Sequence, residues 1–165
     1  MSYTSIYSIQ RIFMKKMVLF ALLAMSLYGA AYQVGQSVAP LELQDQFGKH
    51  IALKIMPKTV IMAFEKGTSG TVNEYLATQN KEYLGLHNSA FIADISQMPN
   101  FITEAFALPK MRKFPYTVLL IRDEEQGLRF PAQEEKITVM KFQGNRVSAI
   151  EFVSTAAQLK QAIEK

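Results

Sequence analysis

Three short apolar runs constrain the fold of this chain more than any other feature. They cover residues 59–64 (TVIMAF), 89–95 (SAFIADI) and 116–121 (YTVLLI). Uninterrupted runs of this length, rich in β-branched and aromatic residues, are typical of strands buried on both faces of a parallel sheet. Helical patterns lie between the runs, so the sequence predicts alternating strands and helices, with helices covering both faces of the sheet.

The flanking segments predict the remaining strands. Residues 33–47 form an extended lead-in, and residues 50–55 alternate apolar and polar side chains as a half-buried strand does. Residues 136–142 and 146–153 predict an antiparallel hairpin, and a capping box that starts at Thr155 opens a closing helix. The predicted architecture is therefore a mixed sheet with a parallel core and a C-terminal antiparallel hairpin.

The connecting segments carry further predictions. Residues 65–70 form a loop before a helix, and residues 123–135 form an exposed, solvated connection. A second helix has Phe101 and Phe106 on one face. We expect this helix to end at Pro109, because proline lacks the backbone N–H that a helix interior needs.

The amino terminus has the three parts of a secretory signal. Lys15 and Lys16 precede an uncharged apolar run, residues 17–31, which ends in small residues. The run has 15 residues, which is short for a membrane-spanning helix of about 20. We predict a signal peptide over residues 1–31 with cleavage after Ala31, and Met14 is a possible true start. The alternatives are an uncleaved membrane anchor and a buried helix.

The leader also accounts for the basic charge of the chain. It holds three of the 18 Lys and Arg residues and none of the 14 acidic residues, so residues 32–165 carry 15 basic and 14 acidic side chains, a net charge of +1. Nucleic-acid binding depends on a basic surplus in the folded domain. The sequence therefore predicts one domain over residues 32–165 that does not bind nucleic acid.

Residues 35–49 (GQSVAPLELQDQFGK) carry a resemblance to a known fold. They place a Gly, a Pro and an Asp-x-x-Gly-Lys turn before the first strand. This opening resembles that of exported thiol–disulfide oxidoreductases and peroxiredoxins, and the resemblance to a thioredoxin-like domain covers approximately residues 34–165. It implies a thioredoxin-like three-layer α/β/α sandwich.

The same resemblance implies where redox cysteines would lie, yet the chain contains no Cys. With residues 59–64 on the family's central strand, Ser69 and Val72 occupy the two positions of its Cys-x-x-Cys motif. Ala63 occupies the position of a buried acid that family oxidoreductases often carry. Thiols and proton acceptor are missing together, which implies a scaffold kept without redox function.

Pro115 resembles the cis-proline that faces the redox loop in this family, although the link from the preceding helix is longer here. A cis bond before proline exposes backbone groups that can pair with an extended peptide. The alternative is an ordinary trans proline at the start of a strand. The resemblance thus implies a peptide-binding groove formed by Thr68, Ser69, Gly70, Phe114, Pro115 and Tyr116.

A basic patch precedes this proline. Lys110, Arg112 and Lys113 could bind an acidic peptide or a phospholipid headgroup. Three cations are few for a binding footprint, so a solvated loop is the alternative.

The sequence gives little support for a catalytic site or a metal site. Ser69 could act as a nucleophile at the start of a helix, but a serine hydroxyl needs an adjacent base, and neither His50 nor His87 is expected near it. Capping of the helix by Thr68 or Ser69 is the simpler role. The two histidines also lack metal-ligand spacing. We predict no catalytic residue, no metal site and no cofactor.

The sequence as a whole predicts an exported, periplasmic, non-catalytic thioredoxin-like protein that binds a protein or peptide partner through this groove. Two alternatives stay open. One is a thiol-independent, hydrolase-like enzyme that uses Ser69 or His87. The other is a structural subunit held at the inner membrane by an uncleaved leader, the only case in which membrane contact is predicted. The oligomeric state is not indicated.

Overall fold

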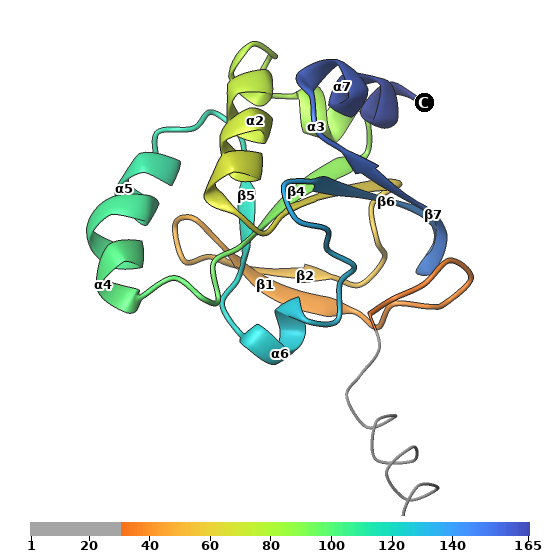
Figure 1. The fold of residues 1–165 in the computed structure, drawn as a ribbon, viewed down its shortest axis with the longest axis horizontal. Helices are drawn as coiled ribbons and strands as arrows, with labels where there is room; N and C mark the ends of the chain where they lie inside the picture. Colours follow the sequence, from red (N-terminus) through yellow and green to blue (C-terminus); the bar gives the residue numbers. More distant parts are fainter. Residues whose placement is uncertain (1–30) are drawn as a thin grey trace, which may run out of the picture. The chain divides into compact units, whose positions relative to one another are not determined.

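The computed structural model describes residues 31–165, which form one compact unit. The predicted signal peptide, apart from Ala31, lies outside the described residues. A single sheet of seven strands runs through the domain in the order β2-β1-β5-β4-β3-β6-β7 (Figure 1). The strands are β1 (Leu41–Asp45), β2 (His50–Leu53), β3 (Thr59–Ala63), β4 (Ser89–Asp94), β5 (Val118–Ile121), β6 (Ile137–Gln143) and β7 (Arg146–Val153).

The three apolar runs form the middle of this sheet, as predicted. β4 pairs in parallel with β3 on one side and with β5 on the other. Every residue of β3 and of β5 is buried, because side chains pack against both faces of the sheet. β6 and β7 form the predicted antiparallel hairpin, with β6 next to β3.

The sheet has a second antiparallel flank, whose extended segments the sequence predicted but whose pairing it did not. The lead-in contains β1, which pairs antiparallel with β5 and with the edge strand β2. β5 begins at Val118, two residues later than expected. The buried side chain of Gln46 satisfies the backbone groups at this point, where strand pairing is absent. Its Nε2 donates to the Tyr116 carbonyl (2.8 Å) and its Oε1 accepts from the Val118 N–H (2.9 Å).

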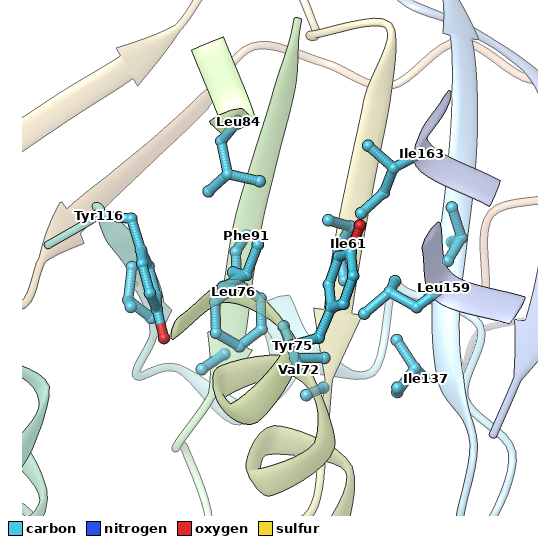
Figure 2. Close-up of a cluster of buried hydrophobic side chains, with 14 of the residues drawn as sticks. Ile61, Val72, Tyr75, Leu76, Leu84, Phe91, Tyr116, Ile137, Leu159 and Ile163 are labelled. Atoms are coloured by element: carbon cyan, nitrogen blue, oxygen red, sulfur yellow. The ribbon is translucent and has the colours of Figure 1, made fainter. Parts of the chain in front are cut away.

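Helices cover the two faces of the sheet unequally. The helical segments are α2 (Lys66–Ala77), α3 (Tyr83–Leu86), α4 (Asn100–Ile102), a π-helical turn (Thr103–Ala107), α5 (Leu108–Met111), α6 (Glu124–Gly127) and α7 (Ala156–Glu164). Side chains from α2, α3, α5 and α7 pack into one core, where Val72, Tyr75 and Leu159 meet Ile61 and Phe91 of the sheet (Figure 2).

The core on the other face is covered mainly by connecting segments. Tyr32, Val38, Met56 and Phe130 lie outside the regular elements, and they pack there against strand residues such as Ile92. Two separate cores therefore hold the sheet, and both are apolar. Among residues 31–165, no helix is long and apolar enough to cross a membrane.

The predicted end of a helix at Pro109 is wrong. The helical path continues through residues 100–111, here called the arm, and Pro109 lies within α5. The turn before it is π-helical, with the Leu108 N–H donating to the Thr103 carbonyl five residues back. This wider turn accommodates a residue that has no N–H to donate.

The apolar face expected on this helix is not the buried one. Thr103 and Leu108 face the core, while Phe101 and Phe106 are 68% and 65% exposed. The π-helical turn changes the phase of the pattern, so an α-helical period assigns the wrong residues to the core.

Candidate functional site

A cleft of about 550 Å³ lies at the carboxyl ends of β3 and β4. Phe64 and Glu65 follow β3, and residues 95–98 follow β4. The segments that leave both strands therefore line the cleft. The first turn of α2 adds Lys66 and Ser69. Ligands of open α/β sheets commonly bind outside the carboxyl ends of parallel strands, and this cleft occupies such a position.

The first turn of α2 is already helical where a loop was predicted. The helix begins at Lys66, and Glu65 is its N-cap rather than Thr68 or Ser69. Thr68 stands at the third helical position, where its Oγ1 accepts from the Glu65 N–H (3.3 Å) and donates to the Glu65 carbonyl (3.0 Å). Thr68 and Val72 are buried against the sheet, and this packing offsets the weak helix propensity of Gly67 and Gly70.

The walls of the cleft are mostly apolar. Met98 and Met111 are partly buried and also pack against the core beneath α2. Leu128, which follows α6, lines the opposite side and is 61% exposed. An exposed leucine beside flexible methionine side chains provides apolar surface for a ligand. The other apolar lining residues are Phe64, Ile95, Phe130 and Ala132.

The charged groups of the cleft are predominantly acidic. Asp94, Glu65 and Glu124 contribute carboxylates, and Lys66 is the one cation among the lining residues. Asp94 Oδ1 accepts from the Ser96 N–H (2.9 Å), and Glu124 Oε1 accepts from the amide of Gln97 (3.2 Å). Three acidic side chains and one lysine therefore border a largely apolar surface, which favours a ligand with cationic groups.

The backbone on the α6 side approaches the end of β4 very closely. A Cβ built on Gly127 would collide with Asp94 Oδ2. Gly127 is buried, and its N–H donates to the Asp123 carbonyl (3.0 Å) in the short helix α6. Glycine at this position thus allows α6 and Leu128 to close one side of the cleft.

The predicted groove residues are distributed over more than one surface. Ser69 lines the cleft, whereas Thr68 lines a smaller hollow with Glu135 and Ser154, and Tyr116 lines a third with Leu84. Gly70 lies in the first turns of α2 and is half-buried. Phe114 and Pro115 are not among the lining residues of the cleft.

Phe114, Pro115 and Tyr116 instead form a packed segment beside α2. The rings of Phe114 and Tyr116 stack at 5.3 Å, and the Tyr116 hydroxyl donates to Asn73 Oδ1 (3.0 Å). Burial raises the pKa of Tyr116 to about 12. The described residues contain no cis peptide bond, so Pro115 is trans, the alternative to the cis-proline that the resemblance implied. The trans isomer is the preferred state of an X–Pro bond.

The basic patch is divided by the fold. Arg112 donates from Nε to the Gln46 carbonyl (3.0 Å) and so holds the end of the arm against the turn after β1. Lys110 and Lys113 are exposed.

The histidines do not assist Ser69. His87 follows α3 and precedes β4, whereas Ser69 follows β3, which runs parallel to β4. The two residues therefore lie at opposite ends of strands about 20 Å long. The His87 ring packs against Tyr83 at 4.5 Å, and His50 bonds to Gln44 on the far edge of the sheet. Residues 31–165 contain no cluster of three His, Cys, Asp or Glu side chains suited to a metal ion.

Sequence reasoning missed the α6 side of the cleft. Residues 123–135 were expected to be an exposed connection, but Asp123 caps α6 by accepting from the Gln126 N–H (2.8 Å), and Phe130 is buried. The available signal was the pair Leu128 and Phe130 within an otherwise polar stretch. Phe130 packs into the core and Leu128 lines the cleft.

Comparisons with known proteins address the fold. No protein-family model matches the sequence, and no curated protein matches it. Solved structures do match. A peroxidoxin, BcpB, from Mycobacterium tuberculosis superposes with a TM-score of 0.52 at 18% identity, over 80% of this chain and 94% of that chain. The domain has a thioredoxin-like fold.

Two further structures agree with this assignment. A putative protein disulfide isomerase from Bacteroides thetaiotaomicron has a TM-score of 0.50 at 15% identity, over 83% of this chain and 94% of that chain. An uncharacterized thioredoxin-like protein from Porphyromonas gingivalis has a TM-score of 0.51 at 14% identity, over 81% and 92%. The resemblance stated from residues 35–49 is thus confirmed at the level of the fold, in a chain without Cys.

Proposed function

We propose that this chain is an exported, periplasmic thioredoxin-like protein that binds a partner polypeptide in the cleft and performs no thiol chemistry. The observation that carries the proposal is the cleft itself. It lies at the carboxyl ends of β3 and β4, has apolar walls with an exposed leucine, and contains Ser69 where the resemblance places a redox cysteine. Export is supported by the charge and length of residues 1–31.

The chemistry of the cleft defines the expected ligand. Apolar walls at Met98, Met111 and Leu128 suit one or two apolar side chains. The carboxylates of Glu65 and Glu124 lie at exposed positions near them. We therefore expect a segment in which an apolar residue is flanked by Lys or Arg, because the opposite charges would fix its orientation.

Catalysis is not required by this proposal. Ser69 has no histidine near it, and a hydroxyl without a base is a poor nucleophile. If a hydrolase activity existed on a panel of model esters and peptides, Ser69→Ala would abolish it. Turnover that is unchanged in Ser69→Ala would exclude Ser69 as the nucleophile.

The experiment begins with identification of the partner. The full chain, expressed in its native host, is captured by affinity, and co-purifying proteins are identified by mass spectrometry. Binding of each purified candidate is then measured by calorimetry with Leu128→Asp and with the matched control Leu86→Asp. Leu86 is similarly exposed, at 74%, but it is the last residue of α3, which precedes the amino end of β4 and so lies away from the cleft.

The proposal predicts that Leu128→Asp weakens binding at least about tenfold, while Leu86→Asp leaves it unchanged. Equal affinity of the two variants would contradict a binding site at the cleft. Phe114→Ala serves as a second comparison, because the groove predicted from sequence includes Phe114 and the cleft does not. A larger loss in Phe114→Ala than in Leu128→Asp would relocate the site to that groove.

Processing is tested separately. N-terminal sequencing of the protein recovered from the host should find a chain that begins at Tyr32. A chain that retains residues 17–31 and sediments with membranes would instead support the anchored structural subunit.

A further inference from the structure

The outer side of the arm exposes two phenylalanine rings that have no role in the cleft. Phe101 and Phe106 are 68% and 65% exposed, and neither lines the cleft or the two smaller hollows. The arm lies at the periphery of the fold, beside α2 and away from the hairpin of β6 and β7 (Figure 1). Exposing two large rings on one helical segment has a cost in water, and neighbouring exposed rings commonly mark an interaction surface.

The π-helical turn brings these rings closer together around the helix. Residues five apart in an α-helix point about 140° away from each other. The turn Thr103–Ala107 lies between Phe101 and Phe106 and takes in an extra residue, which rotates Phe106 toward the side that carries Phe101. Such turns are frequent at functional sites.

Two exposed basic residues follow the rings along the chain. Lys110 follows Phe106 by four positions, which places the two side chains next to each other along the helix, and Lys113 lies in the turn that follows. Both lysines are exposed. The nearest acid in sequence, Glu104, is paired with Arg122 (3.2 Å), so its charge is partly compensated.

We propose that this outer side of the arm, formed by Phe101, Phe106, Lys110 and Lys113, docks on the surface of an anionic lipid bilayer. Exposed rings on a helix can enter the interfacial region of a bilayer, and lysines beside them attract anionic headgroups. The charge complementarity is local, because residues 32–165 as a whole carry a net charge of only +1.

A bilayer suits this surface better than a protein partner does. The rings of Phe101 and Phe106 project from a peripheral helical segment and line none of the three hollows described above. A deformable interface can accept projecting rings without a complementary shape. None of these four residues lines the cleft, although Met111 of the arm does.

The absence of Cys allows a site-specific test in the full chain. Phe106→Cys introduces a single thiol, which is labelled with an environment-sensitive fluorophore. Phe47→Cys is the matched control, since Phe47 is 62% exposed in the turn between β1 and β2. Each labelled chain is mixed with phosphatidylcholine vesicles that contain or lack phosphatidylglycerol, and emission and quenching by lipid-borne quenchers are recorded.

The proposal predicts a blue shift and lipid quenching at position 106 with phosphatidylglycerol, and a much smaller change at position 47. Equal responses at both positions, or no response at position 106, would overturn it. Binding that persists fully on phosphatidylcholine alone would overturn the role of the lysines. Protection of the label at position 106 by an acidic protein, with no response to lipid, would assign the surface to a protein partner instead.

A charge variant provides a second readout on the same labelled chain. Lys110→Gln with Lys113→Gln should weaken the lipid response about fivefold for each lysine, or roughly 25-fold together. Lys54→Gln with Lys160→Gln removes two exposed cations elsewhere and should leave the response unchanged. All four substitutions are at exposed positions, and thermal unfolding identical to the parent confirms that the fold is intact. A similar loss of the lipid response in both double variants would mean that net charge alone causes the effect, and it would contradict the proposal.

Discussion

The two ends of the parallel strands are built in different ways. At the amino end of β4, Tyr75 and Tyr83 are buried, their hydroxyls bond at 2.6 Å, and Tyr83 donates to Glu164 Oε1 at 3.3 Å. We call these three residues the tyrosine cluster. At the carboxyl end, the cleft keeps Leu128 exposed and leaves carboxylates facing an apolar surface.

The difference indicates a division of roles. The tyrosine cluster joins α2, α3 and α7 by side-chain hydrogen bonds, and its two rings meet edge to face at 5.9 Å, so its contacts are satisfied within the domain. The apolar surface of the cleft is not satisfied within the domain. We infer that the first region contributes chiefly to stability and the second to binding, and substitutions can separate the two.

Removal of a ring from the tyrosine cluster should have the largest effect. Tyr83→Ala empties a buried site and should lower the free energy of unfolding by about 3–5 kcal/mol, measured by chemical denaturation. Leu86→Ala, in the same short helix but exposed, should change it by at most about 0.5 kcal/mol. Equal effects would show that the cluster is not a source of stability.

A methyl group on Gly127 should disturb the cleft. Gly127→Ala places a Cβ against Asp94 Oδ2, and because Asp94 Oδ1 is held by the Ser96 N–H, we expect a loss of about 1–3 kcal/mol. In the double variant Gly127→Ala, Asp94→Ala the collision is absent. A double-mutant cycle should therefore give a coupling above about 0.5 kcal/mol, and strict additivity would contradict the close approach.

Removal of a single hydroxyl should have a smaller effect. Tyr83→Phe leaves the buried Tyr75 hydroxyl without its partner, which should cost about 1–2 kcal/mol in unfolding free energy. Tyr116→Phe, whose hydroxyl bonds to Asn73 on the surface of α2, is the matched comparison and should cost less. The reverse order would mean that the Tyr116 hydroxyl contributes more to stability than the tyrosine cluster does.

Alkaline pH should destabilise the fold through the same tyrosines. Burial, followed by the hydrogen bond with Tyr75 and the charge of Glu164, raises the pKa of Tyr83, and burial raises the pKa of Tyr116 to about 12. The unfolded chain loses these protons near pH 10 and the folded chain only at higher pH. Stability is therefore complete below about pH 10 and falls as pH rises toward 12.

The pH effect has its own control. Denaturation midpoints measured from pH 8 to 12 should fall less steeply in Tyr83→Phe than in the parent chain. The same slope in both would mean that Tyr83 titrates alike in the folded and unfolded states.

The smallest effect on folding is expected at the cleft surface. Leu128→Asp removes an exposed side chain and should change the unfolding free energy by no more than about 0.5 kcal/mol, even though it weakens partner binding. A loss of several kcal/mol would mean that Leu128 supports the core, and the division between stability and binding would then fail.

Sequence reasoning succeeded where one physical effect dominated. The runs at 59–64 and 89–95 are apolar on both faces, and only central strands bury both faces, so the parallel core was predictable. It failed at residues 65–70, whose glycines and hydroxyl residues favour a loop locally. Packing of Thr68 and Val72 against the sheet overrides that preference.

The arm and the cleft depended on features that a periodic pattern does not contain. A π-helical turn before Pro109 shifts the phase of the helix, so Phe101 and Phe106 are exposed rather than buried. The cleft joins β3, β4 and α6, and its α6 side depends on the close approach of Gly127 to Asp94. The resemblance named Ser69 as a groove residue, but it did not name the residues that lie across the cleft from it.

Site-specific photo-crosslinking in the native host tests the central claim most directly. A photo-reactive amino acid replaces Leu128 in one chain and Leu86 in another, and the products are compared after irradiation. The account predicts a discrete crosslinked polypeptide at position 128 and none at position 86, since the cleft is the binding surface. No product at position 128, or the same product at both positions, would contradict it.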